Sequence, residues 1–305
     1  MNRRDACKLL GTGALAPAFP RAAVAQSFAI RYVLSSALCG DLPLDEVLGE
    51  VKRSGSGGID IWRKGHATHR EQIEEMGDEA FQSLLKKHDV PLAISTCYPL
   101  GPFKQDDELR WVKKNGGGMT VCASGRMGAP DVSGAEAKAQ VTAFFEKLKP
   151  HYELAEELGL TMAIENHKNA MLSSPDSIRY FAELNPSKAV GIAFAPHHLY
   201  DVVEEIPALI RHCGKENLPF IYFQEYHLSS KQEMPVEEEL KQLPGFGSLD
   251  YVPIVAAMKE IAFDGLAEIF MHPTPRGTPM LPTAPEITDA INKSRAYIDE
   301  CLAKS

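Results

Sequence analysis

The sequence predicts a single α/β domain that folds as a closed (β/α)8 barrel. Short β-rich apolar runs alternate with amphipathic helical stretches, this alternation repeats eight times, and no linker rich in Ser, Gly or Pro divides the chain. Strands separated by helices form right-handed crossover units and a parallel sheet, and eight units in about 280 residues fit a barrel better than an open sheet. No G-x-G-x-x-G motif follows the first strand, which argues against a dinucleotide-binding fold.

The strands and helices are predicted from runs of apolar residues with the corresponding period. In chain order, the strands are expected at 28–34, 58–62, 91–97, 119–123, 161–166, 189–195, 219–226 and 266–272. Stretches with helical spacing of apolar residues lie between and after them, and the clearest are 44–53, 70–87, 135–158, 250–261 and 285–302.

Composition and charge exclude several classes of protein. The chain has 305 residues, 44% of them apolar and 24% charged, and a formal net charge of -9. This composition is unlike that of disordered or low-complexity chains, and no apolar run approaches the roughly 18 to 20 residues of a membrane span. An acidic chain is also unsuited to sequence-independent binding of phosphate backbones, so no nucleic-acid partner is expected.

The first 25 residues have the pattern of an export signal. Arg3 and Arg4 precede a mild apolar stretch, and Ala23-Val24-Ala25 provides the small residues of a signal peptidase site. We therefore expect a Tat-type signal peptide at 1–25, a barrel domain at 26–305 and a periplasmic location. A frayed basic N-terminus is the alternative. The five cysteines beyond residue 25 are odd in number and form no C-x-x-C pair, which argues against a disulfide framework or a structural zinc site.

In such a barrel the active site lies where strands end and loops begin. The fifth predicted strand ends with Glu165, and alternation places His167 on the same face. A carboxylate that closes an apolar strand is costly unless it is paired or bound to a cation. Glu165 is therefore a candidate metal ligand or general base, and the alternative is a salt-bridged residue of the rim.

The sixth and seventh strands also end in polar residues. His197 and His198 follow the sixth and could bind a metal or polarise a carbonyl. Because adjacent side chains generally point apart, we expect at most one of them to face the site; simple polar filling is the alternative. Gln224 and Glu225 end the seventh strand as oxygen donors for a divalent ion, or as partners within the loop.

The eighth and second strands supply further candidates. Glu268, Phe270 and His272 share one face of the eighth strand, and Arg276 in the following Pro-rich turn could clamp an anion or a hydroxyl, or lie free on the surface. Trp62 at the end of the second strand offers an apolar face for a sugar ring, or fills the core. Lys64 and His66, which follow Trp62, are weaker candidates for substrate binding.

Three segments carry a resemblance to a known family. Residues 163–166 (AIEN), 194–199 (FAPHHL) and 244–250 (PGFGSLD) resemble those of the xylose isomerase-like TIM barrels, a superfamily of sugar isomerases and epimerases that also includes endonuclease IV. The resemblance covers essentially the whole chain after residue 25. The N-terminal signal and residues 270–277 (FMHPTPRG) resemble an exported subgroup.

The resemblance implies one divalent metal, bound through Glu, Asp, His and Glu on strands five to eight. It also implies proton transfer between carbons beside a carbonyl, through an enediolate. Glu165 matches the first ligand and His198 the histidine that follows the aspartate. Ala195, Gln224 and Phe270 occupy the positions of the other three ligands.

The replacement of three of the family's four metal ligands has two interpretations. Either the metal site is lost, or it is rebuilt from Glu165, His198, Gln224 and His272, with Glu225 in reserve. One carboxylate, two imidazoles and an amide suit Mn²⁺, Co²⁺ or Zn²⁺ better than Ca²⁺. We favour the rebuilt site, because a polar residue is found at each strand end where a ligand is replaced.

The leading functional hypothesis is an exported, metal-dependent isomerase or epimerase that acts on a sugar or keto-sugar. Glu165 or His198 would abstract the α-proton, and the residues expected to bind substrate are Trp62, Lys64, His66, His167, Glu268 and Arg276. Lyase or hydratase chemistry on a keto-glycoside and a non-catalytic carbohydrate-binding barrel are the alternatives. DNA repair is opposed by the acidic charge and the export signal. Barrels of this kind often form homo-oligomers, which are compatible with this sequence.

Overall fold

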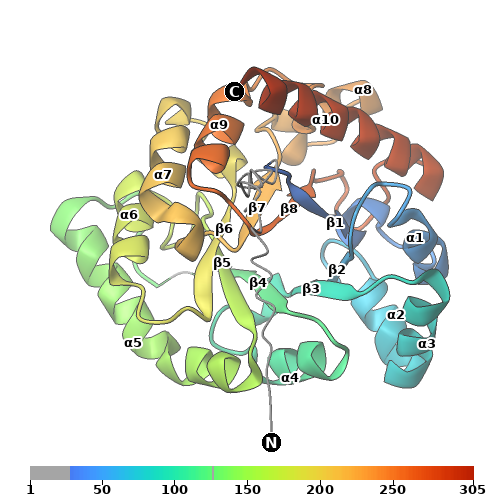
Figure 1. Ribbon diagram of the computed structural model, residues 1–305, viewed down its shortest axis with the longest axis horizontal. Helices are drawn as coiled ribbons and strands as arrows, with labels where there is room; N and C mark the ends of the chain where they lie inside the picture. The colour runs from blue at the N-terminus through green and yellow to red at the C-terminus, as the bar shows by residue number, and fades with distance from the viewer. Residues whose placement is uncertain (1–27, 126) are drawn as a thin grey trace, which may run out of the picture.

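Eight parallel strands close into a barrel at the centre of the molecule (Figure 1). The structure is a computed structural model that describes residues 28–125 and 127–305. The strands are β1 (Arg31–Ser35), β2 (Ile59–Trp62), β3 (Leu92–Thr96), β4 (Met119–Ala123), β5 (Thr161–Glu165), β6 (Val190–Phe194), β7 (Phe220–Phe223) and β8 (Leu266–Ile269). Each strand pairs in parallel with its neighbours in sequence, and β1 closes the barrel against β8 with Arg31 opposite Leu266. The predicted fold is confirmed.

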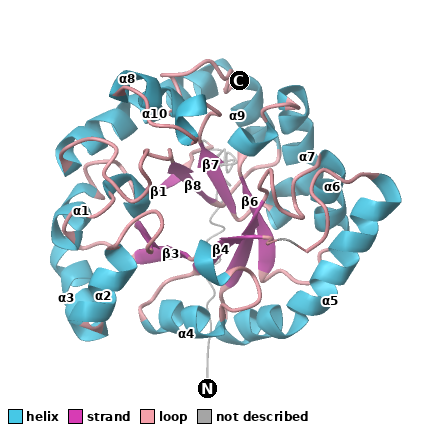
Figure 2. Ribbon diagram, turned by 180° about the vertical axis from the view of Figure 1, so that it is seen from behind, coloured by secondary structure: helices cyan, strands magenta, loops and turns pink. Residues whose placement is uncertain are grey.

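Helices surround the strands on the outside of the barrel, as the view from behind shows (Figure 2). They are α1 (Leu44–Glu50), α2 (His69–Met76), α3 (Asp78–His88), α4 (Asp106–Lys114), α5 (Gly134–Leu158), α6 (Pro175–Leu184), α7 (Ile206–Asn217), α8 (Val236–Glu239), α9 (Val252–Glu260) and α10 (Ala284–Lys304). Among the described residues, none of these helices combines the length and apolarity needed to cross a bilayer.

The prediction of one helix over residues 70–87 is wrong. The segment forms α2 and α3, which are separated at Gly77, whose φ of 83° and ψ of 158° are not helical. The apolar spacing continues across the break, so the pattern alone suggested a single helix. A glycine adopts this backbone conformation without the steric cost that a Cβ would bring.

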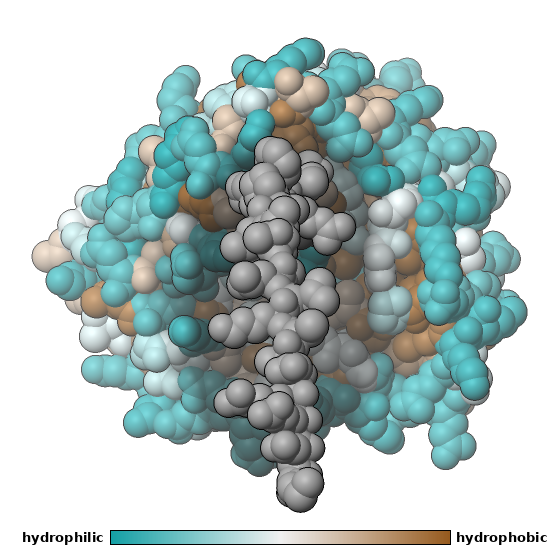
Figure 3. Space-filling model, in the orientation of Figure 1, coloured by the Kyte–Doolittle hydropathy of each residue, from teal (hydrophilic) through white to brown (hydrophobic). Residues whose placement is uncertain are grey.

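The core lies between the barrel and its ring of helices. Strand residues such as Ile61, Ile164 and Ile192 are fully buried, because a strand of a barrel is covered on both faces. In Figure 3, hydrophilic residues predominate around the periphery of the molecule, and hydrophobic residues show mainly closer to its centre. The five cysteines in the described part of the chain are buried and free. The predicted signal peptide at 1–25 lies outside the described residues.

Candidate functional site

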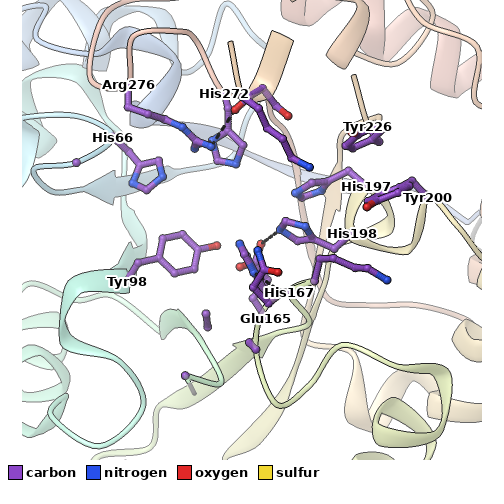
Figure 4. Close-up of a pocket in the computed structure, with 18 residues that line it drawn as sticks. His66, Tyr98, Glu165, His167, His197, His198, Tyr200, Tyr226, His272 and Arg276 are labelled. Carbon is purple, nitrogen blue, oxygen red and sulfur yellow. Dashed lines mark hydrogen bonds and ion pairs between the residues drawn. The ribbon is translucent and has the colours of Figure 1, made fainter. Parts of the chain in front are cut away.

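A cavity of about 740 Å³ opens at the C-terminal ends of the strands. Its lining includes residues that end or follow seven of the strands, β2 to β8, and ten of the lining residues are labelled in Figure 4. They are His66, Tyr98, Glu165, His167, His197, His198, Tyr200, Tyr226, His272 and Arg276. Five of these ten are histidines, which come from loops far apart in the sequence and converge on one space.

Glu165, His197 and His198 form the tightest group of possible metal ligands. One ligand atom from each lies within 4.8 Å of the other two, and Glu165 Oε1 is 3.8 Å from His198 Nε2. Glu165 is the last residue of β5, and the two histidines belong to a short 3₁₀ helix, η3 (Pro196–Leu199), that follows β6. The carboxylate and the imidazoles therefore lie at adjacent strand ends.

Asn166 fixes these two strand ends relative to each other. Its side chain accepts a hydrogen bond from the Ala195 backbone N–H at 2.7 Å and donates one to the Ala195 carbonyl at 3.0 Å. Asn166 directly follows Glu165, and Ala195 precedes η3. This reciprocal pair holds the histidine turn beside the carboxylate.

Both histidines of the pair line the cavity, although we expected at most one to face it. That expectation assumed an extended chain, in which adjacent side chains point in opposite directions. In a 3₁₀ helix there are three residues per turn, so adjacent side chains are only about 120° apart. The ring centroids of His197 and His198 lie 3.9 Å from each other.

The atoms of this group fit a divalent metal. Glu165 Oε2, both ring nitrogens of His197 and His198 Nε2 are buried and have no hydrogen-bond partner among the described residues. Buried polar atoms normally have partners, so each unpartnered atom needs an explanation. A carboxylate oxygen and two imidazole nitrogens are ligands typical of zinc, cobalt or manganese sites.

Burial sets the protonation states around the cavity. It raises the pKa of Glu165 to about 8, against the opposing effects of the Tyr98 hydroxyl and Arg276. Burial, followed by the neighbouring His167 and Arg276, holds the pKa of His197 well below its usual value. The same cause, with His197 next, lowers the pKa of His198. The imidazoles are therefore neutral at neutral pH, which is the state that binds a metal.

Four more of the predicted residues lie in the same cavity. The ring centroid of His167 is 4.0 Å from that of His198, and the ring centroids of His66 and His272 are 5.4 Å apart. Arg276 donates a hydrogen bond to His272 Nδ1 and so lies at the mouth next to that ring (Figure 4). His272 is outside the tight group of ligand atoms, and its contact with Arg276 occupies one of its two ring nitrogens.

Gln224 and Glu225 are placed away from the cavity lining. The Gln224 amide donates to Gln242 Oε1 at 3.1 Å, and Gln242 in turn bonds both the N–H and the carbonyl of His272 at 3.0 and 2.9 Å. Glu225 accepts hydrogen bonds from the backbone N–H groups of Ser248 and Leu249 at 2.6 and 2.8 Å. Both side chains hold loops in place around the site.

The remaining predicted substrate contacts also lie outside the lining. Trp62 is 1% exposed and stacks on Phe270, with 4.9 Å between ring centroids, so it fills the core. Lys64 is exposed to solvent. Glu268 is fully buried inside the barrel, where it interacts with Asp60.

Sequence reasoning missed several residues of the lining: Tyr98, Lys168, Tyr200, Tyr226, Ser230 and Lys231. The signal for Tyr98 was available, because it directly follows the third predicted strand, 91–97. Lys168 is likewise adjacent to His167. Tyr200, Ser230 and Lys231 lie farther along loops, and no strand pattern places a loop side chain.

Comparison with known proteins identifies the family. Residues 48–297 match the family described as xylose isomerase-like TIM barrel, and the chain belongs to it. No curated protein matches the sequence.

Solved structures share the fold at low sequence identity. The IolI protein with a bound zinc atom aligns with a TM-score of 0.68 and 14% identity, over 90% of this chain and 99% of that one. A D-psicose 3-epimerase gives a TM-score of 0.65 and 14% identity, with the same coverage of 90% and 99%. The 3-keto-D-glucoside 4-epimerase YcjR of E. coli gives 0.61 and 13%, over 87% and 99%.

Proposed function

We propose that this protein is a divalent-metal-dependent enzyme of the sugar isomerase or epimerase type, exported by its N-terminal signal and acting on a sugar or keto-sugar. One observation carries the proposal: the ligand atoms of Glu165, His197 and His198 lie within 4.8 Å of one another in the cavity. The solved structures that share the fold include sugar epimerases, which supports the choice of substrate class.

Glu165, His197 and His198 would hold the metal, with Mn²⁺, Co²⁺ or Zn²⁺ best suited to this donor set. When bound, the cation would supply Lewis-acid polarisation of a carbonyl and so acidify the neighbouring C–H bond. Its positive charge would also offset the burial that raises the pKa of the Glu165 carboxyl.

The side chains of the cavity would move the proton. Of Glu165 and His198, the group with an atom left free by the metal would act as the base and take the proton from the carbon next to the carbonyl. Glu165 has a second carboxylate oxygen for this role. Loss of this proton gives an enediolate. Return of the proton to another carbon, or to the opposite face, completes isomerisation or epimerisation.

Elimination is a second candidate. Tyr200 and Tyr226 stack with 4.0 Å between ring centroids at the edge of the cavity and are about a third exposed, at 37% and 38%. Aromatic faces of this kind pack against sugar rings, and they would give room for a second ring. Loss of that ring from a keto-glycoside would start from the same enediolate.

The test is hydrogen exchange at the α-carbon. Purified protein loaded with Mn²⁺, Co²⁺ or Zn²⁺ is incubated in D₂O with a panel of aldoses, ketoses and 3-keto-glycosides, and deuterium incorporation is followed by mass spectrometry. We expect incorporation into at least one substrate, reduced at least about 10²-fold by Glu165→Gln, which removes a metal ligand and a candidate base. An unsaturated product would favour elimination. No exchange with any compound would leave a carbohydrate-binding barrel.

A further inference from the structure

The charge of the cavity is opposite to that of the chain. The whole sequence carries a formal net charge of -9. The lining of the cavity contains three cationic side chains, Lys168, Lys231 and Arg276, against the single carboxylate of Glu165. A cleft that carries one sign of charge concentrates ligands of the opposite sign.

Lys168 differs from the other two cations because its charge is already balanced. Its ammonium lies 2.6 Å from Asp201 and 3.3 Å from Asp131. Arg276 and Lys231 form no ion pair with any carboxylate in the described parts of the chain, 28–125 and 127–305. Two cations therefore remain available to a ligand.

Both free cations are held in place by neighbouring groups. Arg276 donates hydrogen bonds to His272 Nδ1 and, at 3.4 Å, to the Ser230 carbonyl. The Lys231 ammonium lies 5.2 Å from the ring of Tyr226 and 5.9 Å from that of Tyr200, within the range of cation–π attraction. Because Ser230 precedes Lys231, the bond from Arg276 places its guanidinium beside the backbone of the loop that carries Lys231.

The position of these residues in the barrel is also informative. Ser230 and Lys231 lie in the loop after β7, and Arg276 lies in the loop after β8. In (β/α)8 barrels these two loops frequently contribute to a phosphate-binding site. A guanidinium presents paired N–H donors that match the two oxygens of an oxyanion.

We propose that Arg276 and Lys231 form a subsite for an oxyanion, and that the substrate is a sugar carrying a carboxylate or a phosphate. The inference rests on the proposed function, because it assigns the substrate class of the same cavity. The sugar ring would lie toward Glu165 and the histidines, and its anionic group would lie at the mouth between the β7 and β8 loops.

The experiment is a set of calorimetric titrations of the metal-loaded, full-length protein. The probes are matched neutral and acidic sugars: glucose with glucuronate, galactose with galacturonate, and glucose 6-phosphate as the phosphate arm. We expect at least one acidic sugar to bind at least tenfold more tightly than its neutral partner, with the difference falling as salt is added. The oxyanion is identified by whether the sugar carboxylates or the sugar phosphate bind more tightly.

Charge-removing variants test the two residues. We expect Arg276→Gln and Lys231→Gln each to weaken binding of the acidic sugar about 10- to 100-fold, the range for a charged hydrogen bond, and to leave neutral sugars unaffected. The matched controls Arg110→Gln and Lys113→Gln remove the same charges from exposed positions on α4, and they should keep the preference.

The results separate this inference from the proposed function. Equal binding of acidic and neutral sugars in every pair, or a preference that survives Arg276→Gln, would overturn the inference even if α-carbon exchange is observed. A preference that depends on Arg276, in a protein that shows no exchange with any sugar, would uphold the subsite and remove the proposed catalysis.

Discussion

Gly77 sets the boundary between α2 and α3 through its backbone. Its N–H donates to the Ile73 carbonyl at 2.9 Å and ends α2, while its own carbonyl accepts from Phe81 N–H at 3.1 Å in the first turn of α3. A Cβ at this position would meet no atom within 4 Å. The requirement for glycine is therefore conformational and not steric.

We expect Gly77→Ala to lower the free energy of unfolding by about 1–2 kcal/mol, because an L-residue is strained at positive φ. Gly49→Ala is the matched control: Gly49 lies within α1, where an added Cβ would make only an ordinary contact with His88 at 3.7 Å. Alanine there should raise stability by up to about 1 kcal/mol. Denaturant unfolding measures both. Equal effects of the two substitutions would contradict this account.

At the residue scale, the sequence located part of the site. Glu165 and His198 could be found because they end apolar strands, where a polar residue stands out. The role of Trp62 could not be predicted from the sequence, because an indole at a strand end can either fill the core or pack against a sugar ring. Its stacking on Phe270 in the structure shows that it fills the core. The inward turn of His197 depended on a local 3₁₀ conformation that apolar periodicity does not encode.

At the scale of elements, β2 and β8 each contribute a buried carboxyl to the inside of the barrel. Asp60 and Glu268 are both fully buried, and Asp60 Oδ2 accepts a hydrogen bond from Thr96 Oγ1 at 2.7 Å. Burial raises the pKa of Asp60 to about 7. Burial, and then the adjacent Asp60, raises the pKa of Glu268 well above its usual value. Two such groups cannot both ionise cheaply.

These shifts predict a dependence of stability on pH. Each group has a higher pKa in the folded state than in the unfolded state, so its contribution to stability is complete below the unfolded value near 4 and is lost as pH rises through the folded-state pKa, which is about 7 for Asp60. We expect Glu268→Gln to be more stable than wild type at pH 8 and to lose this advantage toward pH 5. The two curves should diverge by up to about 1.4 kcal/mol per pH unit.

Urea unfolding at pH 5, 6, 7 and 8 measures this effect. Glu157→Gln, which removes an exposed carboxyl from the outer face of α5, is the matched control and should follow the wild-type curve. Parallel curves for Glu268→Gln and wild type would show that the buried pair has no such role.

The elements themselves were largely predictable. All eight strands were expected from apolar runs, because strands covered on both faces require them, and each lies within or close to its predicted range. The break at Gly77 was missed because a continuous apolar stripe says nothing about the backbone of one exposed residue.

At the scale of the whole molecule, barrel closure brings the separate strand ends together. The loops after β2, β5, β6 and β8 are far apart in sequence, yet their histidines line one cavity. This convergence follows from the fold, so the general location of the site could be predicted from the sequence. The paths of the longer loops could not, and for that reason Lys231 and the tyrosine pair were found only in the structure.

Metal analysis tests the central claim, that Glu165, His197 and His198 bind one divalent ion. Protein stripped with a chelator, reloaded with Zn²⁺ or Mn²⁺ and desalted would be analysed by plasma mass spectrometry. The account predicts about one equivalent in wild type, which is typical of a site with this donor set, retention in Gln224→Ala, and loss in Glu165→Gln and His197→Ala. No stoichiometric metal in wild type, or retention in His197→Ala with loss in Gln224→Ala, would contradict it.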